Sequence, residues 1–483
     1  MKQRVPNQRP RRGSVIVIVI WSIAIAAVIV GAAQVLAFRQ AAMGRESIAK
    51  VEARWAARAG VEETLAVLEY HTEEPDVTDS RQMFKDLELV ADGQLSSGDW
   101  QIRHVEDGVE IKGPQDEHAK LNVNNVDRLT LLELSGMTMD VADAIVDWRD
   151  TDDNPGMMGA EYDFYVNRGL GYEPRNGSFR SVAELELVAG AFPKYVRGED
   201  QNLNGRLDPN ENDGALSEPQ DDADGFLDAG WSGALTARSS GSLLSASGEE
   251  RINLKTATPE EMQERFGVTV EQANALSSFG KSNSAKMEML LTQELATLAS
   301  GGANTRTGGA STRGTGARTP TGSNNAAPTD ETGRQTGRSS SGAPAANPAG
   351  ARVQSLDSTQ LRRIFQEGTL DAEGAPILGK VNLNTAPPSI LRALLPNDPI
   401  SADAILSLRS ASSTGLLALS DLRSSNRISP DSLAAIAPYA DTQSYVFTVT
   451  SRGRSATTGL EVEITAVIDR STLPARILEY REQ

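Results

Sequence analysis

The sequence predicts an α+β protein in which a long N-terminal helix packs on a small antiparallel sheet and a large helical domain is inserted into that sheet. Three observations lead to this prediction. An uncharged apolar run near the N-terminus continues without a break into an amphipathic one. Alternating strand patterns occur near the two ends of the remaining chain, and similar helical segments lie between them. Strands and helices that segregate in this way are typical of the α+β class.

The first element is a transmembrane helix, predicted over residues 14–38. No charged residue occurs between Ser14 and Phe38, and a helix of this length crosses a hydrocarbon layer of about 30 Å. The alternative is a cleavable secretory signal, but the apolar region of such a signal is only about 7–15 residues long. The first thirteen residues are basic, so the positive-inside rule keeps the N-terminus in the cytoplasm and the bulk of the chain outside it. Their charges are Lys2, Arg4, Arg9, Arg11 and Arg12.

The same helix is predicted to continue to about Tyr70. Apolar residues recur there at helical spacing, and Glu46 and Lys50 form an i,i+4 pair in the favourable order. Only Gly44 and Gly60 interrupt the pattern. We therefore expect a single rod that begins in lipid and becomes the spine of a water-exposed domain. Its apolar positions are Ile48, Val51, Trp55, Ala59, Leu65 and Leu68.

This N-terminal segment resembles the class III signal of type IV pilins and type II secretion pseudopilins, because a short basic leader ends at Gly13 and an apolar helix begins at Ser14. The resemblance implies that a prepilin peptidase cleaves after Gly13 and methylates Ser14. Most family members carry a glutamate at the fifth mature position, which is Ile18 here. In lacking this glutamate the chain resembles the K-type minor pseudopilins (general secretion pathway protein K), which cap the fibre tip. An ordinary membrane anchor with a coincidental Gly13 is the alternative.

Composition limits the chemistry of the chain. The 483 residues carry a net charge of −18, mostly after the anchor, which favours cation binding over a nucleic-acid surface. There is no cysteine, so disulfides cannot hold a chain that we place outside the cytoplasm. His71, His104 and His118 have no metal-binding spacing. We find no catalytic constellation and expect no enzyme.

Strands are predicted on both sides of the helical region. Trp100, Ile102 and His104 alternate with polar residues, and Asp107-Gly108 supplies the turn of a β-hairpin. Matching strands are predicted at 445–450 and 460–468, with a further one at 476–480. We expect all of them to join in one pilin-like sheet beside the spine, and two separate small sheets are the alternative. The stretch from 71 to 98 is predicted as a loop with a short helix.

Three segments share a repeat. In each, an extended piece containing an asparagine leads into a helix, and a second helix follows after a short turn. In the second segment Thr258, Pro259 and Glu261 form a capping box with proline at the first helical position. The hairpins resemble helix-hairpin-helix modules but lack the paired glycines of the DNA-binding members, and the third turn carries Asp398 where phosphate would bind. The segments are 121–136, 252–267 and 381–396.

A further resemblance lies in the insertion. The runs 147–165 and 176–190 are similar to the inserted domain of K-type minor pseudopilins. This resemblance implies a calcium site, and an acidic loop that faces water is the alternative. Its residues would be Asp147, Asp150, Asp152, Asp153 and Glu161.

A calcium loop is also predicted from Asp200 to Glu211, with the sequence DQNLNGRLDPNE. Its oxygen-bearing residues and its glycine fall at the positions that the twelve-residue calcium-binding loop requires. We expect a structural Ca²⁺ ion that rigidifies a chain without disulfides. The predicted ligands are Asp200, Asn202, Asn204, Arg206 through its carbonyl, Asp208 and Glu211.

A second and weaker calcium loop is predicted from Gln220 to Trp231. It is weaker because its first and last positions, Gln220 and Trp231, are not acidic ligands. Three alternatives are open for this loop: it pairs weakly with the first loop, it uses Asp221 as a substitute ligand, or it is only a solvated turn. Its predicted ligands are Asp222, Asp224, Phe226 through its carbonyl, and Asp228.

The resemblance as a whole implies a minor pseudopilin of a type II secretion system, held in the inner membrane with its bulk in the periplasm. The implied partners are I- and J-type pseudopilins, the prepilin peptidase, the inner-membrane secretion platform and membrane lipid, with no nucleic acid. A membrane-tethered DNA receptor of the uptake type is the alternative. The predicted organisation is a cytoplasmic leader (1–13), the transmembrane helix (14–38), the pilin-like domain (39–120 and 441–483), the inserted helical domain (121–299), a disordered linker (300–352) and a third hairpin segment (353–440).

Overall fold

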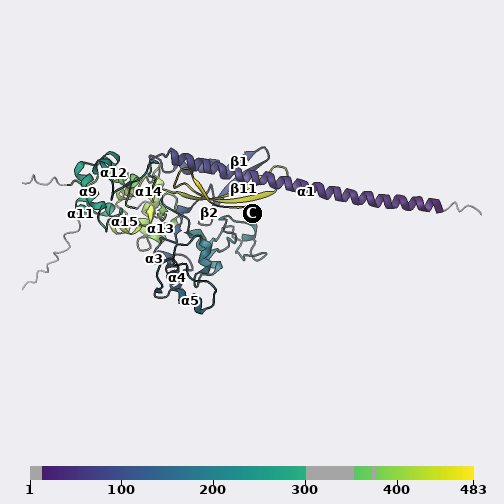
Figure 1. Ribbon diagram of the computed structural model, residues 1–483, viewed down its shortest axis with the longest axis horizontal. Coiled ribbons are helices and arrows are strands. Elements are labelled where there is room, and N and C mark those ends of the chain that lie inside the picture. The colour runs from purple at the N-terminus through teal and green to yellow at the C-terminus, as the bar shows by residue number, and fades with distance from the viewer. Residues whose placement is uncertain (1–13, 301–352, 372–376, 483) are drawn as a thin grey trace, which may run out of the picture.

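The computed structural model describes residues 14–300, 353–371 and 377–482. The predicted leader with Gly13, and residues 301–352 of the predicted linker, lie outside them. Helix α1 (Ser14–Glu73) is continuous, as predicted. Figure 1 shows that its first part extends far beyond the rest of the chain, whereas its second part lies along the sheet. Among the described residues, α1 is the one helix that is long and apolar enough to cross a membrane.

The strands from the two ends of the chain form one sheet, as predicted. The strand order is β1-β2-β11-β12-β13, with β3 paired to β2 and β4 paired to β11. The hairpin of β2 and β3 turns at Asp107 and Gly108, which both have positive φ. Strand β1 was not predicted. The bounds are β1 (Asp92–Leu95), β2 (Gly98–Glu106), β3 (Val109–Lys112), β4 (Gln115–Asp116), β11 (Val446–Ser455), β12 (Glu461–Asp469) and β13 (Arg476–Glu482).

The two faces of this sheet serve different partners within the chain. Along β11, Phe447 and Val449 point to α1 and share a buried cluster with Val61 and Leu68 of that helix. The alternate residues Thr448, Thr450 and Arg452 point the other way and donate hydrogen bonds to the insertion. Since side chains alternate along a strand, one face of the sheet holds the spine and the other holds the inserted domain.

The face of α1 that packs on the sheet consists mostly of small residues. Ala49, Ala53 and Ala57 are fully buried, and Gly453 of β11 approaches the α1 backbone so closely that a Cβ atom would lie 2.1 Å from the carbonyl oxygen of Ala53. Of the predicted apolar positions, Leu68 is buried and Ala59 and Leu65 are partly so. The large side chains of Ile48, Val51 and Trp55 remain 60%, 53% and 56% exposed.

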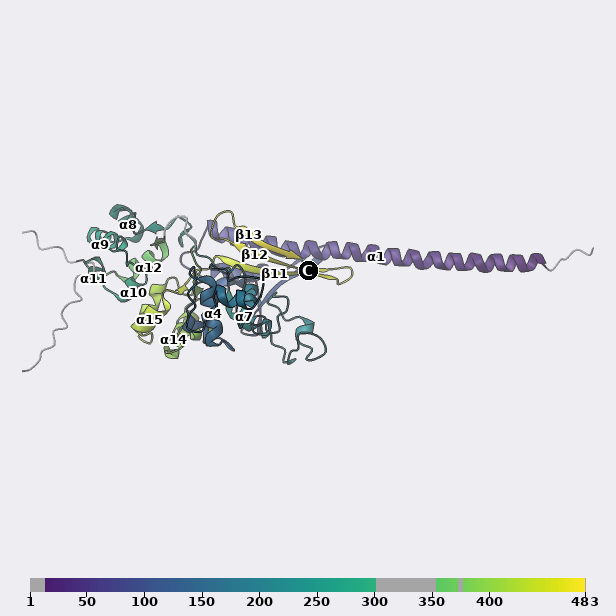
Figure 2. The same ribbon diagram turned by 60° about the horizontal axis from the view of Figure 1, so that its bottom comes forward.

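The insertion lies between β4 and β11 in the sequence. Figures 1 and 2 show its helices near the end of α1 that is farthest from the apolar segment. Helix α2 (Gln82–Val90) precedes the sheet and is the short helix predicted within 71–98. The inserted helices are α3 (Arg128–Leu131), α4 (Met139–Arg149), α5 (Tyr162–Asn167), α6 (Pro193–Val196), α7 (Gly230–Ala234), α8 (Pro259–Phe266), α9 (Val270–Gly280), α10 (Met289–Thr292), α11 (Leu295–Ala299), α12 (Ser358–Glu367), α13 (Pro388–Leu394), α14 (Pro399–Ala411) and α15 (Pro430–Ile436).

The three repeated segments adopt one local structure. Each begins with a two-residue strand in a parallel pair and continues into two helices: α3 and α4, α8 and α9, and α13 and α14. The asparagine of each repeat accepts a hydrogen bond of 2.9 Å from the backbone nitrogen two residues later, and this turn starts the segment. These residues are Asn122, Asn253 and Asn382. The pairs are β5 (Leu121–Asn122) with β6 (Leu235–Thr236), β7 (Ile252–Asn253) with β8 (Gly368–Thr369), and β9 (Val381–Asn382) with β10 (Ala440–Asp441).

Helix starts in these repeats follow the predicted capping chemistry. Thr258 and Glu261 exchange hydrogen bonds in a capping box at the start of α8, with Pro259 at the first helical position. In the third repeat Asp398 caps α14 and accepts hydrogen bonds from Ser401 and Ser432, which lower its pKa to about 2. A fixed carboxylate therefore occupies the turn that a phosphate would need. The relation of these hairpins to helix-hairpin-helix modules stays a prediction.

Candidate metal centre

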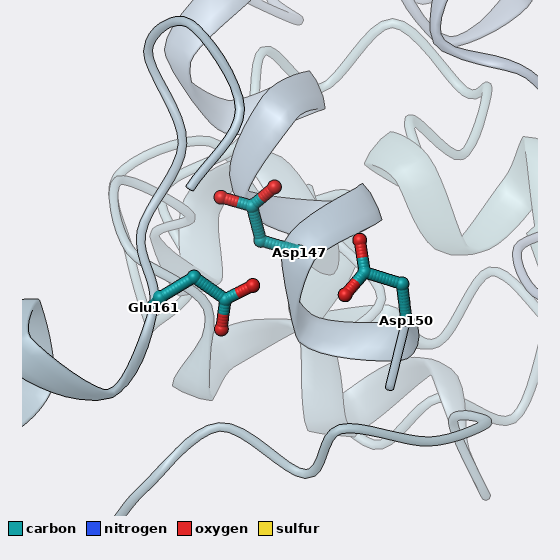
Figure 3. Close-up of side chains that lie close together, drawn as sticks. All are labelled: Asp147, Asp150 and Glu161. Carbon is teal, nitrogen blue, oxygen red and sulfur yellow. The ribbon is translucent and has the colours of Figure 1, made fainter. Parts of the chain in front are cut away.

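Three carboxylates converge at the end of α4. Asp147 lies in its last turn, Asp150 follows directly after it, and Glu161 precedes α5. One oxygen atom from each lies within 4.8 Å of the others, and Figure 3 shows the three side chains gathered around the end of the helix. Asp147 and Glu161 are only 2% and 4% exposed. We call these three residues the triad.

The chain between the last two triad residues is held by glycines. A Cβ atom on Gly159 would lie 1.8 Å from a carboxylate oxygen of Asp147, and one on Gly156 would lie 3.1 Å from the other oxygen. The backbone nitrogen of Gly156 donates to that carboxylate at 3.0 and 3.1 Å. The loop can therefore fold over Asp147 and bring Glu161 back to the helix, because no side chain intervenes at these two positions.

Aromatic residues pack around Trp148, which directly follows Asp147 of the triad in α4. Trp148 stacks on Phe179 and meets Tyr165 edge to face. Its indole nitrogen donates to Glu184 at 3.0 Å, and the hydroxyl of Tyr165 accepts a hydrogen bond from the backbone of Ala189. These contacts bury Trp148 in the last turn of α4, the turn that also carries Asp147.

Within the described ranges, three of the triad's carboxylate oxygens have no hydrogen-bond donor. Among the described residues, both carboxylate oxygens of Glu161 and one of Asp150 are buried without a hydrogen-bond partner. Burial, together with the neighbouring charges of Asp147 and Asp150, raises the pKa of Glu161 to about 7. Burial is also the main cause that raises the pKa values of Asp147 and Asp150. A bound divalent cation would satisfy these oxygens, and all-oxygen sites of this kind suit Ca²⁺.

The cluster predicted from sequence is wider than the triad. Asp152 and Asp153 are exposed, and their carboxylates accept hydrogen bonds from Asn154 and Asn176. They lie outside the group of three. Their contribution is to the electrostatic potential, since both raise the pKa of Glu161 through their charges.

In the predicted loop from Asp200 to Glu211, backbone hydrogen bonds orient the first and the last carboxylate. The Asp200 carboxylate accepts hydrogen bonds from the backbone of Asn204 and Gly205, and Gly205 has a φ of 65°. The Glu211 carboxylate accepts from the backbone of Gln201 and Asp208. A carboxylate has about four acceptor sites, so these bonds orient Asp200 and Glu211 and still leave lone pairs for a cation.

The side chains of Asn202, Asn204 and Asp208 contact one another or Arg452. The side-chain nitrogens of Asn202 and Asn204 donate to one oxygen of Asp208, and Arg452 pairs with the other. The backbone of Arg206 donates to the side chain of Asn204. Among the described residues, the acidic groups of this loop do not approach one another as closely as those of the triad. The loop would therefore require Asp208 to move to complete an ion site.

The second loop is more exposed, and its acidic side chains bind backbone nitrogens. Asp222 accepts from Asp224, Asp224 accepts from Phe226, and Asp228 accepts from Gly230. Sequence patterns missed one neighbour. Glu199 accepts a hydrogen bond from the backbone of Asp228 at 3.0 Å, and burial, helped by the charges of Asp222 and Asp228, raises its pKa. Because Glu199 stands before both loops, no loop motif includes it.

Residues 113–198, which include the triad, match the family model described as type II secretion system (T2SS), protein K. A comparison with curated proteins finds no match. A similar solved chain comes from the crystal structure of the GspK-GspI-GspJ complex from the type 2 secretion system of enterotoxigenic Escherichia coli. Its identity is 10% and its TM-score 0.43, with 91% of this chain and 99% of that chain covered. The similarity to the protein K family of type II secretion systems covers residues 113–198, the segment that builds the triad.

Proposed function

We propose that this chain is a minor pseudopilin of a type II secretion system, that α1 anchors it in the inner membrane with the bulk of the chain in the periplasm, and that it initiates or caps the fibre. The family match over residues 113–198 carries the proposal. The continuous helix α1 supports it, because a rigid rod that starts in lipid transmits membrane anchoring directly to the folded domain.

Two features favour a place at the tip. Position 18 in the apolar part of α1 is isoleucine, so no carboxylate is offered to the amino terminus of a neighbouring subunit. The inserted helices surround the far end of α1 (Figures 1 and 2). This bulk would obstruct a further subunit from stacking above, whereas it leaves the apolar part of α1 free to pack among other helices.

The proposal predicts a processed amino terminus. In cells with the prepilin peptidase, mass spectrometry should detect a chain that begins at methylated Ser14, and in cells without it the chain should begin at the intact leader. Gly13→Leu should block cleavage, whereas Ser14→Ala should still be processed. An intact leader in peptidase-containing cells would contradict the pseudopilin assignment and favour an ordinary anchor.

The exposed apolar face of α1 is the proposed contact for the I- and J-type pseudopilins. Ile48, Val51 and Trp55 fall at i, i+3 and i+7, and together with Ser97 they line a shallow hollow. The stripe continues the apolar segment of the same helix into the water-exposed part. We assign an α-helix of a partner pseudopilin as its occupant, since an amphipathic helix meets its partner through such spacing.

Trp55→Ala is expected to weaken the complex with the I- and J-type pseudopilins by more than tenfold in Kd, because a buried interface tryptophan commonly contributes about 2 kcal/mol or more. Leu89→Ala is the matched control, because Leu89 is also highly exposed but lies on α2. Isothermal titration calorimetry measures both, and circular dichroism checks that the fold is unchanged. Equal affinities for the two variants would place the interface elsewhere.

We further propose that Ca²⁺ binds the triad and the loop from Asp200 to Glu211 and acts as a structural ion. The unpartnered oxygens of Glu161 support the first site, and the oriented carboxylates of Asp200 and Glu211 support the second. When bound, the ion would neutralise buried acidic charge and rigidify a chain that has no cysteine.

A further inference from the structure

The segment between α4 and Glu161 is fastened to α4 by two acidic side chains that lie one helical turn apart. Gly156 donates its backbone N–H to Asp147 at 3.0 and 3.1 Å. Met158 donates its backbone N–H to Asp143 at 3.0 Å. Residues four apart share one face of a helix, so α4 presents both carboxylates to this segment. Because three residues span at most about 10 Å, the bond at Met158 limits where Glu161 can lie.

Asp143 holds the segment without belonging to the triad. Among the described residues, its carboxylate is not one of the three that converge, and it is 4% exposed. The Nε atom of Arg128 on α3 lies 2.6 Å from one oxygen of Asp143, and Met158 donates to the other. Each oxygen thus has its own partner. A buried carboxylate that is paired in this way keeps its place, because moving it would leave a buried charge unpaired.

Glu161 is in the opposite situation. It is also 4% exposed, but within the described ranges neither of its oxygens has a hydrogen-bond partner. The charges of Asp147 and Asp150 repel the charge of Glu161. A carboxylate that is buried, unpartnered and repelled needs a restraint that keeps it beside α4. The bond from Met158 to Asp143 supplies such a restraint, and it uses no member of the triad.

We propose that Asp143 is a positioning residue of the triad: oriented by Arg128, it anchors the backbone of Met158 and thereby holds Glu161 at its ligand position. This inference rests on the proposed binding of calcium at the triad. Groups that orient metal ligands commonly change metal affinity about 10–100-fold when they are replaced. Asp143 is not part of the acidic cluster predicted from the sequence, since only the fold brings Met158 back to it.

Asp143→Asn in the full-length protein tests the inference. The variant keeps the shape of the side chain but has one oxygen, which cannot serve Arg128 and Met158 together. Calcium titration calorimetry should show an affinity at least about tenfold lower. The titrations use an Asp200→Asn background, which removes the other proposed site. Asp163→Asn is the matched control, because it removes the same charge from an exposed side chain nearby and should change the affinity much less.

Terbium luminescence supplies a readout that a loss of charge alone would not change. Tb³⁺ takes oxygen ligands as Ca²⁺ does, and its lifetimes in H₂O and D₂O report how many water molecules bind the ion. Trp148 lies next to Asp147 in α4 and can sensitise an ion at the triad. When Asp143→Asn releases Glu161, about one or two more water molecules should take the place of its two oxygens. Asp163→Asn should leave the water count unchanged.

Hydrogen exchange of the parent protein tests the anchor without any substitution, so the result does not depend on whether Asp143→Asn folds. In chelator, the amide of Met158 should exchange much more slowly than in an unstructured peptide, and exchange at the peptide rate would overturn the inference. If Glu161→Gln abolishes calcium binding but Asp143→Asn changes neither affinity nor water count, Asp143 has no positioning role and only this inference fails. If Glu161→Gln leaves the titration unchanged, the triad binds no calcium and the proposed site fails with it.

Discussion

Replacing Gly453 with alanine is expected to destabilise the pilin-like domain by about 3 kcal/mol or more, the upper end of the range for overpacked cores. A Cβ atom at this position would lie 2.1 Å from the Ala53 carbonyl oxygen and 2.2 Å from the Ala57 nitrogen. Both are backbone atoms of α1, so no side chain can rotate away. The strand and the helix would have to separate, and the buried cluster that includes Val449 and Val61 would open.

Two glycine-to-alanine substitutions on α1 serve as comparisons for the loss of stability expected of Gly453→Ala. Gly60→Ala would meet the Ser451 hydroxyl at 2.5 Å and the Trp100 ring at 2.6 Å, and because these are side chains a smaller loss is expected. Gly44→Ala has no atom within 4 Å and should gain up to about 1 kcal/mol from helix propensity. Urea unfolding followed by tryptophan fluorescence ranks the three. If Gly453→Ala were as stable as the parent, α1 would not be packed on the sheet as described.

The spine and the sheet were predictable because their signals are periodic. The uncharged run after Ser14 flows into helical spacing without a proline, and Asp107-Gly108 is a strong hairpin signal. The packing face of α1 was not predictable in the same way. Ala53 and Ala57 pack against β11 at Gly453, whereas the larger Ile48 and Trp55 point outward. The largest apolar side chains of α1 therefore do not mark the face that packs on the sheet. That face carries small residues, because the helix and strand backbones approach each other closely there.

The candidate sites differ in what sequence can reveal. The loop from Asp200 has fixed ligand spacing, and its oriented carboxylates follow from local turns. The triad depends on a glycine-lined loop that returns Glu161 to α4, so the resemblance indicated the cluster but spacing did not select its three members. Glu199 reaches the second loop, and the sheet residue Arg452 reaches the first, only through the tertiary fold. Contacts of that kind leave no local pattern.

Glu161→Gln is expected to change stability in opposite directions with and without calcium. In a chelator near neutral pH the variant should be more stable than the parent, because a neutral amide replaces a buried carboxylate that faces Asp147 and Asp150. With calcium the order should reverse, because only the parent gains binding energy at the triad. That gain is about 2.7 kcal/mol at a free ion concentration one hundred times Kd. Thermal unfolding of the full-length protein in both conditions measures the crossover.

Asp163→Asn is the matched control for this crossover. Asp163 is an exposed acid two residues further along the chain and lies outside the triad, so its neutralisation removes the same formal charge from the same region. It should leave the calcium-induced rise in Tm intact. If both variants lost that rise equally, the ion would respond to the general negative potential of this region. If Glu161→Gln alone lost it, and was also more stable in chelator, the unpartnered oxygens of Glu161 would be ligands, since no purely structural role of that side chain gives both signs.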